Sequence, residues 1–280
     1  MIEKPSIGVG LGLRREISLN LVQELPQSLD CLEVAPENYL GTGGKFWRQL
    51  CALGERYPIL FHGISLTSLG TLEDFDWDLL KQAKKLADQF NSPWMSDHLC
   101  YSSVKGFQFH DLLPLPFTEE AIKHVVPKIK TLQDFFEKPF AIENISYYAH
   151  PGKAEMSEWE FVARIAELAD CALLLDVNNI YVNSVNHRFE AKAYIDALPL
   201  ERVLQVHVAG HRVMEDFLLD THGASVIDPV WDLLSYLATK TSLPAVIVER
   251  DNNLPDLQEL IKEVEIAKKV IRQANDHKTN

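Results

Sequence analysis

The chain has 280 residues, of which 46% are hydrophobic and 24% are charged, so it carries enough apolar material for one large core. Its formal net charge of −13 argues against non-specific nucleic-acid binding, which needs a basic face. Four isolated cysteines without a CxxC pair, no secretion signal and no apolar run near the roughly 18 residues that span a bilayer predict a cytoplasmic protein with reduced thiols and no membrane contact.

Short apolar segments alternate along the chain with helical patterns. The strand-like segments cover residues 7–13, 31–35, 59–62, 94–99, 140–145, 172–177, 203–208 and 245–249. Most are apolar on both faces, as buried parallel strands are. The helical patterns cover residues 18–25, 46–57, 79–90, 119–136, 158–169, 190–198, 230–239 and 257–271. We expect the polar tail, at about 274–280, to fray.

Eight strand–helix units fill the chain, and this alternation predicts a parallel sheet of the α/β class. Eight units fit a closed (β/α)8 TIM barrel, formed as a single domain over residues 1–280. An open doubly wound sheet is the alternative, but it lacks support from a GxGxxG motif. Gly8, Gly10 and Gly12 occupy alternate positions and do not match that motif. We interpret them as positions of close backbone packing in the first strand.

Side chains that can bind metals or carry protons stand at the carboxyl ends of the predicted strands. They are Glu33, Glu37, His62, Asp97, His98, Glu143, Asn144, Asp176, Asn178, Asn179, His207, His211 and Glu249. The carboxyl ends of barrel strands meet on one face, where the active site is built. We therefore expect the residues at six consecutive strand ends to meet there: His62, His98, Glu143, Asp176, His207 and Glu249.

This predicted cluster combines three imidazoles with three carboxylates. Carboxylates at such short range repel one another unless their pKa values rise or a cation lies between them. Imidazole and carboxylate without thiolate suit iron, manganese, zinc or cobalt. Six ligands are too many for one ion with an open position, so we predict two ions that share Glu143. Glu143 and Asp176 are the carboxylates that we expect to act in catalysis.

Further residues extend this prediction. Asp220 and His222 follow the seventh strand, and with Asn179 they offer the ligands of a third ion. We interpret Glu33, Glu37 and Asp97 as carboxylates that orient ligand imidazoles, although simple salt bridges remain an alternative. Asn144, Asn178 and His211 are predicted to support the ligands in the same way.

Each ligand-type residue also has a simpler interpretation on its own. A histidine at a strand end is often only hydrogen-bonded in the core or rim. Asp176 alone could cap the next helix, and Glu249 alone could pair with Arg250 or Arg212. Asp220 and His222 alone could be ordinary loop residues. Six such residues on six consecutive strand ends favour the metal site over a series of unrelated roles.

The same motifs carry a resemblance that spans nearly the whole chain in order. The matching segments are Gly8-Val-Gly-Leu-Gly-Leu-Arg14, Glu33-Val-Ala-Pro-Glu-Asn38, His62-Gly-Ile-Ser65, Ser96-Asp-His98, Glu143-Asn144, Leu175-Asp-Val-Asn-Asn-Ile-Tyr-Val-Asn183, Gln205-Val-His-Val-Ala-Gly210, Asp220-Thr-His-Gly223 and Glu249-Arg-Asp251. In these segments the chain resembles the multinuclear non-haem iron-dependent oxidative enzymes (MNIO), of which the methanobactin-maturing oxidase is the best-known type.

This resemblance implies a TIM barrel that holds two or three irons in mixed ferrous and ferric states. Carried over by position, one iron would be held by His62, His98 and Glu143, a second by Glu143, Asp176, His207 and Glu249, and a third, weaker site by Asn179, Asp220 and His222. Asn178 is an alternative to Asn179 as the amide ligand. The implied activity is dioxygen-dependent oxidation of cysteine residues in a ribosomally made precursor peptide, with a small partner protein that recognises the peptide's leader.

Two other classes of function remain open from the sequence. A metal-dependent TIM-barrel sugar isomerase or epimerase, or a related endonuclease, would use the same residue types, and the charge of −13 counts against DNA but not against a sugar. A partner-binding barrel with purely structural metals would have coordinatively closed sites. Barrel specificity lies in the βα loops, so we expect substrate contacts from the loops at 41–44 and 102–116.

Overall fold

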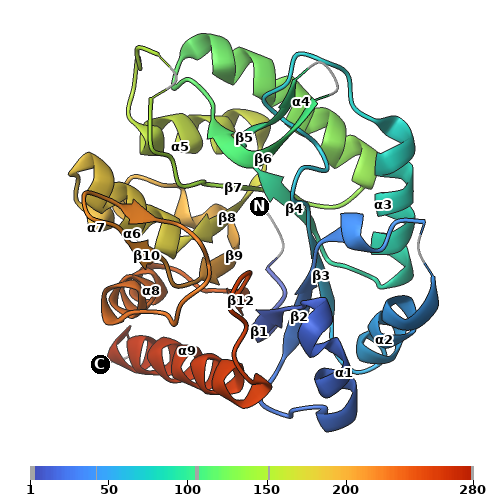
Figure 1. The fold of residues 1–280 in the computed structure, drawn as a ribbon. Helices are drawn as coiled ribbons and strands as arrows, with labels where there is room; N and C mark the ends of the chain where they lie inside the picture. Colours follow the sequence, from blue (N-terminus) through green and yellow to red (C-terminus); the bar gives the residue numbers. More distant parts are fainter. Residues whose placement is uncertain (1–3, 42, 105–106, 151, 279–280) are drawn as a thin grey trace.

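A closed barrel of parallel strands forms the centre of the molecule (Figure 1), as the computed structural model of residues 4–41, 43–104, 107–150 and 152–278 shows. The strands follow one another around the barrel in the order β1-β12-β9-β8-β7-β4-β3-β2. Their bounds are β1 Gly8–Gly12, β2 Cys31–Val34, β3 Ile59–His62, β4 Met95–His98, β7 Phe140–Glu143, β8 Ala172–Asp176, β9 Val203–Val208 and β12 Ala245–Val248. The predicted (β/α)8 barrel is therefore confirmed.

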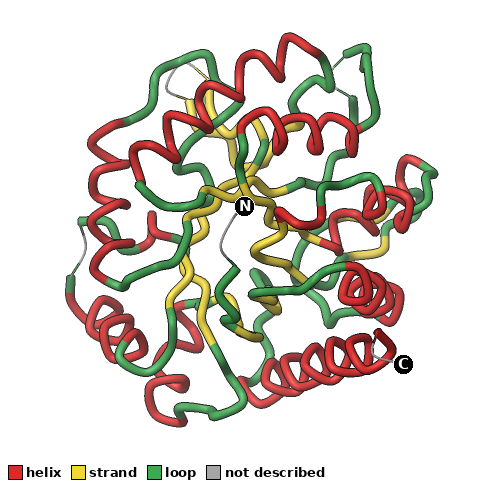
Figure 2. The backbone as a smooth tube through the Cα atoms, turned by 180° about the vertical axis from the view of Figure 1, so that it is seen from behind, coloured by secondary structure: helices red, strands yellow, loops and turns green. Residues whose placement is uncertain are grey.

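Helices surround the barrel on its outside, as the view from behind also shows (Figure 2). They are α1 Arg15–Glu24, α2 Gly44–Gly54, α3 Trp77–Gln89, α4 Glu119–Phe136, α5 Glu158–Ala169, α6 Val177–His187, α7 Ala191–Asp196, α8 Asp228–Lys240 and α9 Leu257–Lys278, with short 3-10 turns η1 Pro36–Asn38 and η2 Leu200–Arg202. Side chains of Asp76, Thr118 and Ser157 accept backbone N–H groups and so fix where α3, α4 and α5 begin. Among the described helices, none is both long and apolar enough to cross a membrane.

Helices α6 and α9 differ from the sequence prediction. A single helix at 190–198 was predicted after the sixth barrel strand, but α6 begins directly at Val177 and the short α7 follows it. The first turns of α6 are rich in asparagine and β-branched residues, which give a weak helical signal. Helix α9 continues to Lys278 instead of ending near 271, and its buried residue Ala274 packs within the tail that was expected to fray. Residues 279–280 lie outside the described part of the chain.

The predicted loop at 102–116 is largely a β-hairpin. β5 (Cys100–Val104) pairs antiparallel with β6 (Phe107–Pro114), and the hairpin leaves the barrel two residues after His98. It lies beside α4 and α5 (Figure 1). A second short hairpin, β10 (Arg212–Val213) and β11 (Leu218–Leu219), follows β9. Residues 105–106 of the first hairpin, and residue 42 in the loop at 41–44, are outside the described residues.

Two apolar layers stabilise this architecture. The inner layer fills the barrel with Cys31, Leu60, Trp94, Ala141, Ala172, Leu174, Leu204, Ala245 and Ile247. The outer layer packs the strands against the helices. The glycines of the first strand act as predicted, since a Cβ at Gly10 would lie 2.2 Å from the carbonyl oxygen of Cys31. The inner layer leaves the carboxyl ends of the strands to polar side chains.

Candidate metal centre

The ligand-type residues predicted at six consecutive strand ends converge at the carboxyl end of the barrel. Strand pairing sets two of these contacts directly, because His98 is the register partner of Glu143 and Asp176 is that of His207. All six side chains are buried or nearly so: His62, His98, Glu143, Asp176, His207 and Glu249. Their meeting follows from the barrel geometry, since strands far apart in the sequence end on the same face.

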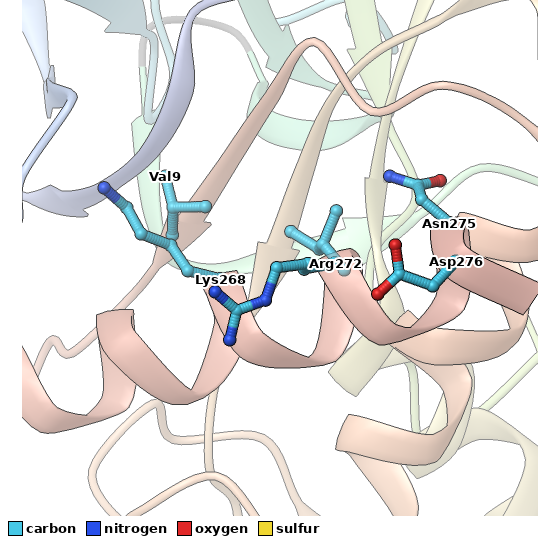
Figure 3. Close-up of a pocket in the computed structure, with 6 residues that line it drawn as sticks. Val9, Lys268, Arg272, Asn275 and Asp276 are labelled. Carbon is cyan, nitrogen blue, oxygen red and sulfur yellow. The ribbon is translucent and has the colours of Figure 1, made fainter.

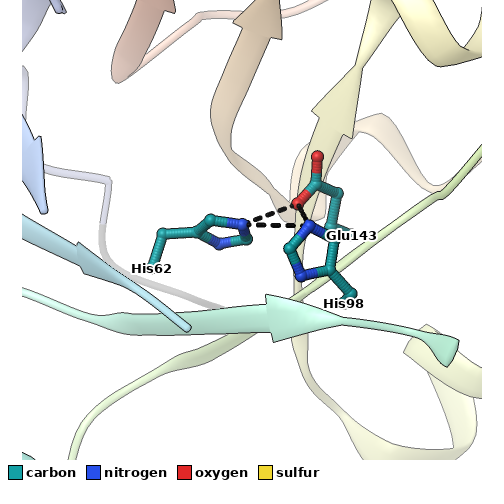
Figure 4. A group of neighbouring side chains, drawn as sticks. All are labelled: His62, His98 and Glu143. Carbon is teal, nitrogen blue, oxygen red and sulfur yellow. Dashed lines mark hydrogen bonds and ion pairs between the residues drawn. The ribbon is translucent and has the colours of Figure 1, made fainter. Parts of the chain in front are cut away.

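The first cluster joins two histidines and one glutamate, with both rings turned toward the same carboxylate (Figure 4). Glu143 Oε2 lies 2.9 Å from His62 Nε2 and 3.2 Å from His98 Nε2, and the two ring nitrogens are 3.3 Å apart. The other nitrogen of His62, Nδ1, lies 2.9 Å from the Ser96 hydroxyl, so Nε2 is the nitrogen that faces the cluster. This donor set suits a transition-metal ion.

The second cluster uses the other oxygen of the same glutamate. His207 Nδ1 lies 3.3 Å from Glu143 Oε1 and 3.0 Å from Glu249 Oε2. Ligand atoms of Glu143, Asp176 and His207 lie within 4.8 Å of one another. Glu143 therefore offers one oxygen to each cluster, which is the arrangement that a bridging carboxylate requires.

A third cluster surrounds His222, in the loop after β11. Its Nε2 lies 2.9 Å from Asp220 Oδ1 and 3.4 Å from Asp176 Oδ2. Ligand atoms of Asp176, His222 and Glu249 also lie within 4.8 Å of one another. His222 adopts a φ of 45°, a left-handed conformation that is uncommon for residues other than glycine.

The two neighbouring asparagines at the start of α6 have different surroundings. Asn178 uses its whole amide, because Nδ2 donates to Asp220 Oδ1 at 2.9 Å and Oδ1 lies 2.7 Å from His211 Nδ1. Asn179 Oδ1 is buried and has no hydrogen-bond partner among the described residues. The free amide oxygen therefore belongs to Asn179, while Asn178 contacts both Asp220 and His211.

Two of the three predicted orienting carboxylates lie beside imidazoles. Glu33 Oε2 is 2.8 Å from His207 Nε2. Asp97 Oδ1 is 3.5 Å from His98 Nδ1, and Asp97 Oδ2 accepts both the N–H and the hydroxyl of Thr67 at 2.7 Å. Both carboxylates thus stand behind a ring whose other nitrogen faces a cluster.

Glu37 has a different role from the predicted one. Its Oε1 accepts the backbone N–H groups of Ile64 and Ser65 at 2.8 and 3.0 Å, and among the described residues no imidazole is hydrogen-bonded to it. The reason is local: the 3-10 turn η1 carries Glu37 toward the loop that follows β3 rather than into the barrel. Glu37 therefore fixes the backbone next to His62 instead of a ligand ring.

Asn144 ties two of the ligand-bearing strand ends together. Its Nδ2 donates to the carbonyl of Asp176 and its Oδ1 accepts the N–H of Asp176, both at 3.0 Å. Its own carbonyl accepts from Asn179 Nδ2 at 3.2 Å. This reciprocal pair fixes the end of β8 against the end of β7, which places Asp176 relative to Glu143.

The simpler interpretations of two ligand-type residues can now be compared with the structure. Asp176 does cap α6, since Oδ1 accepts the N–H of Asn179 at 2.8 Å, but its Oδ2 is left facing the clusters. Glu249 pairs with neither predicted arginine. Its Oε1 instead accepts from Arg14 Nη2 at 2.9 Å, while Arg250 pairs with Glu263.

Sequence reasoning missed several residues that surround the clusters. Arg14 bonds Asp251 as well as Glu249, and Asp251 Oδ2 lies 3.3 Å from His222 Nδ1. Asp220 is held by the Ser146 hydroxyl at 3.1 Å and donates its N–H to Tyr148 Oη at 2.8 Å. Arg14 and Asp251 stand in the first and last strand-end motifs, so their position was a signal. Their direct pairing joins residues 237 apart, which no local pattern reveals.

Burial and charge shift the pKa values throughout the clusters. Burial alone would raise the pKa of Glu143, but the imidazoles of His98, His62 and His207 outweigh it and hold that pKa well below its usual range. Burial and the negative charges of Glu143 and Asp220 raise the pKa of Asp176 to about 8, although His222 opposes the shift. These opposite shifts mark carboxylates that share one charged environment.

The imidazoles respond to the carboxylates around them. Burial acts to lower the pKa of His98, but the negative charges of Glu143 and Asp97 outweigh this effect and raise the pKa to about 9. Burial is likewise overcome at His222, where Asp220 and Glu249 raise the pKa well above its usual value. Without a cation, the clusters therefore bind protons where their charges would otherwise repel.

The residues present fit a group of bound cations. Besides His98 Nδ1, which faces Asp97, five buried atoms at the clusters lack a hydrogen-bond partner among the described residues: Glu143 Oε2, Asp176 Oδ2, Asn179 Oδ1, His207 Nδ1 and His222 Nε2. Buried polar atoms normally have hydrogen-bond partners, so five unpartnered atoms close together need an explanation. Cations coordinated by these nitrogens and oxygens would satisfy all of them at once.

A hollow of about 330 Å³ lies away from the clusters, where Val9 meets the second half of α9 (Figure 3). Its other lining residues are Lys268, Ile271, Arg272, Asn275 and Asp276. Lys268 Nζ is already paired with Asp30 at 2.7 Å. This hollow is lined by none of the predicted ligand residues, so the converging side chains, and not this hollow, mark the candidate functional site.

Comparison with solved structures places the fold among TIM-barrel epimerases. The chain is similar to an L-ribulose 3-epimerase, with a TM-score of 0.64 and 12% identity over 98% of this chain and 96% of that one. It is also similar to D-psicose 3-epimerase from Clostridium cellulolyticum H10, with a TM-score of 0.57 and 11% identity over 97% and 98% of the two chains. At such identities the likeness concerns the fold alone.

Sequence comparison identifies much closer relatives. The chain is 48% identical to a UPF0276 protein from Shewanella loihica over 91% of each chain, and 46% identical to one from Alcanivorax borkumensis over 94% of this chain and 91% of that one. Residues 8–272 match the family model described as RiPP precursor modification enzyme MbnB/TglH/ChrH. This agrees with the resemblance noted from the strand-end motifs. The chain therefore belongs to the family of RiPP precursor modification enzymes MbnB/TglH/ChrH.

Proposed function

We propose that the protein is a multinuclear non-haem iron oxidase that uses dioxygen to modify cysteine residues of a ribosomally made precursor peptide. The observation that carries this proposal is the sharing of carboxylates between the clusters. Glu143 offers one oxygen to each of two clusters, and Asp176 lies within reach of both the second and the third. Shared carboxylates suit a centre of several adjacent ions better than independent mononuclear sites. Membership of a family of peptide-modifying enzymes supports the peptide substrate.

Three groups of residues would hold the irons. The first iron would be held by His62, His98 and Glu143, the second by Glu143, Asp176, His207 and Glu249, and the third by Asn179, Asp220 and His222. Bound iron would supply the activation of dioxygen and would lower the pKa of a coordinated cysteine thiol. Glu143 and Asp176 are the proposed catalytic carboxylates, because they adjoin more than one cluster.

The chain's own residues would orient this centre and hold its protons. Ser96 directs His62 Nε2 toward the first cluster, and Asn144 fixes Asp176 against β7. Asp97 stands behind His98, while Arg14 neutralises Glu249 at the edge of the second cluster. The hairpin β5–β6 begins two residues after His98, so it is the proposed contact for the peptide chain beside the first cluster.

A small leader-recognising partner protein is part of this proposal, as is a cytoplasmic location.

The competing function is metal-dependent sugar epimerisation, which the similar folds make worth testing. The experiment compares iron-, manganese- and cobalt-reconstituted protein in two assays. One follows dioxygen uptake and the mass of a cysteine-containing precursor peptide encoded beside the gene, and the other follows ketohexose epimerisation. Iron-dependent oxygen uptake with an altered peptide mass would support the oxidase. Epimerisation with manganese or cobalt, without oxygen uptake, would overturn it.

A further inference from the structure

The two ring nitrogens of His207 face different partners. Nδ1 lies 3.0 Å from Glu249 Oε2 and 3.3 Å from Glu143 Oε1, whereas Nε2 lies 2.8 Å from Glu33 Oε2. Glu33, His207 and Glu249 also lie close enough together to hold a cation. Two mutually exclusive roles are therefore open to Glu33. It either binds a metal itself or accepts a hydrogen bond from His207 Nε2.

A series of hydrogen bonds inside the barrel favours the second role, in which Glu33 accepts a proton from His207. Gln205 Nε2 donates to Glu33 Oε2, and Gln205 Oε1 accepts from the indole Nε1 of Trp94 at 2.9 Å. The indole N–H can only donate, so the amide oxygen of Gln205 must face Trp94 and its NH₂ group must face Glu33. Gln205 Nε2 also lies 3.1 Å from His207 Nε2, but the shorter contact of that ring nitrogen, 2.8 Å, is to Glu33 Oε2. A carboxylate oxygen can only accept, so this contact places the proton on His207 Nε2, and Glu33 Oε2 accepts from both Gln205 Nε2 and His207 Nε2.

The hydrogen-bonded series Trp94–Gln205–Glu33–His207 is buried inside the barrel and joins strands on different sides of it. Trp94, Gln205, Glu33 and His207 are all at most 2% exposed. Trp94 directly precedes β4, while Gln205 and Glu33 lie on β9 and β2, which are not neighbours in the barrel. Hydrogen bonds at such depth are strong, and an unpaired member would be costly, so each side chain has one favourable orientation.

A β-bulge in β9 brings the chain together. The pairing of β8 with β9 shifts after Val203, so that Leu174 lies opposite Gln205 instead of Leu204. Leu204 packs into the inner apolar layer, and the next residue, Gln205, also reaches the barrel interior, where it meets Trp94. Bulges beside active sites re-aim side chains in this way. Here the extra residue lets Leu204 face the interior as well as Gln205 and His207, which share the inner face because they are two positions apart.

We propose that Trp94 and Gln205 are positioning residues that hold Glu33 as a hydrogen-bond acceptor, so that His207 keeps its proton on Nε2 and presents Nδ1 as the metal ligand. Glu33 is then excluded from the metal. This inference rests on the metal centre of the proposed function, but it depends on neither iron nor dioxygen nor the peptide. It predicts that substitutions of Trp94 or Gln205, which are not metal ligands, weaken metal binding at the second cluster but not at the first.

The first test identifies the nitrogen of His207 that binds a metal. Protein labelled with ¹⁵N-histidine is loaded with ¹¹³Cd(II) as the probe, and His207 signals are assigned by their loss in His207→Gln. We expect a one-bond coupling between ¹¹³Cd and Nδ1, with Nε2 still protonated. Coupling to Nε2 would overturn the proposal, because it would make Glu33 a neighbour of the metal. Since no substrate or iron is present, a failed oxidase assay would leave this result unaffected.

The second test uses Gln205→Met and Trp94→Phe, with Trp231→Phe of α8, a buried tryptophan of the outer apolar layer, as a matched control. We expect Gln205→Met to weaken cadmium binding at the second cluster about 10- to 100-fold while the first cluster keeps its ion. Trp94→Phe, which keeps an aromatic side chain but removes the indole N–H, should cause a smaller selective loss, and it carries the test if Gln205→Met does not fold. Equal loss from both clusters, or unchanged affinity in Trp94→Phe, would show a merely structural role and overturn the proposal.

Discussion

His98 and Glu143 face each other across neighbouring strands, as register partners of the β4–β7 pairing whose side chains meet with Nε2 and Oε2 3.2 Å apart. Glu143 is 1% exposed, and its other oxygen faces His207. A buried carboxylate between imidazoles from three strands is costly unless it is paired or bound to a cation. The centre of the proposed site is therefore one side chain on which two clusters depend.

Glu143→Gln should weaken metal binding at both adjoining clusters. The amide has the same shape but lacks the charge and can present only one oxygen, so it cannot bridge two ions. We expect metal content measured by mass spectrometry to fall by at least one ion per chain and activity to be lost. Glu37→Gln is the control, because Glu37 contacts only backbone N–H groups. Full metal occupancy in Glu143→Gln would remove Glu143 as the bridge.

Metal binding should displace protons from the site. The pKa of His98 is raised to about 9 by Glu143 and Asp97 against the effect of burial, so at neutral pH this ring holds a proton in the metal-free protein. A ligand nitrogen must be deprotonated, so apparent affinity for cobalt(II) should rise between pH 6 and 9, about tenfold per pH unit for each proton displaced. Calorimetry in two buffers of different ionisation enthalpy measures the protons released. An affinity that is independent of pH would contradict the assignment of His98.

Glu158, at the start of α5, should make the metal-free protein less stable as the pH rises. Burial raises the pKa of Glu158 to about 8, although hydrogen bonds from Tyr194 and Asn183 oppose the shift. Its folded pKa lies above the unfolded value near 4.5, so its stabilising contribution is complete below pH 4.5 and is lost as the pH rises through 8.

Glu158→Gln stays neutral and isolates this contribution from that of the histidines. Relative to the unsubstituted protein, the free energy of unfolding of the variant should increase between pH 5 and 9 by more than about 1 kcal/mol. Urea denaturation of chelated protein at several pH values provides the measurement. Parallel stability curves for the two proteins would show that Glu158 does not titrate in this range.

Asn144→Leu should destabilise the fold through Asp176. The substitution leaves the buried N–H and carbonyl of Asp176 without their partner, which costs about 2–4 kcal/mol. Gln133→Leu, which loses one partly buried bond to the carbonyl of Ala169, should cost less than about 1.5 kcal/mol. Chemical denaturation of both variants checks the difference. Equal losses would mean that the Asn144 pair does not fix the end of β8.

The barrel and the converging ligands could be predicted because both depend on simple periodicities. Strands such as Phe140–Glu143 are short apolar runs, and parallel strands of a barrel must end on one face. The position of Glu143 in its strand was therefore enough to place it beside His98. The start of α6 was missed because its cap, Asp176, is also the end of a strand and its first turn has low helical propensity.

Features that depart from the regular barrel could not be predicted. Trp94 and Gln205 are 111 residues apart, and their hydrogen bond depends on a bulge that has no local sequence signature. Glu37 looked equivalent to Glu33, yet the turn η1 carries it to a backbone loop instead of an imidazole. The sequence predicts a loop at 102–116 because the strands of the hairpin β5–β6 pair with each other, outside the regular alternation of strands and helices.

The most direct test of the central claim is the metal content of protein purified without oxygen, combined with a Mössbauer spectrum of the same sample. The sharing of Glu143 and Asp176 among the clusters predicts two to three irons per chain, magnetically coupled in ferrous and ferric states. One or two zinc or manganese ions that persist after iron supplementation would contradict the oxidase and favour a metal-dependent epimerase.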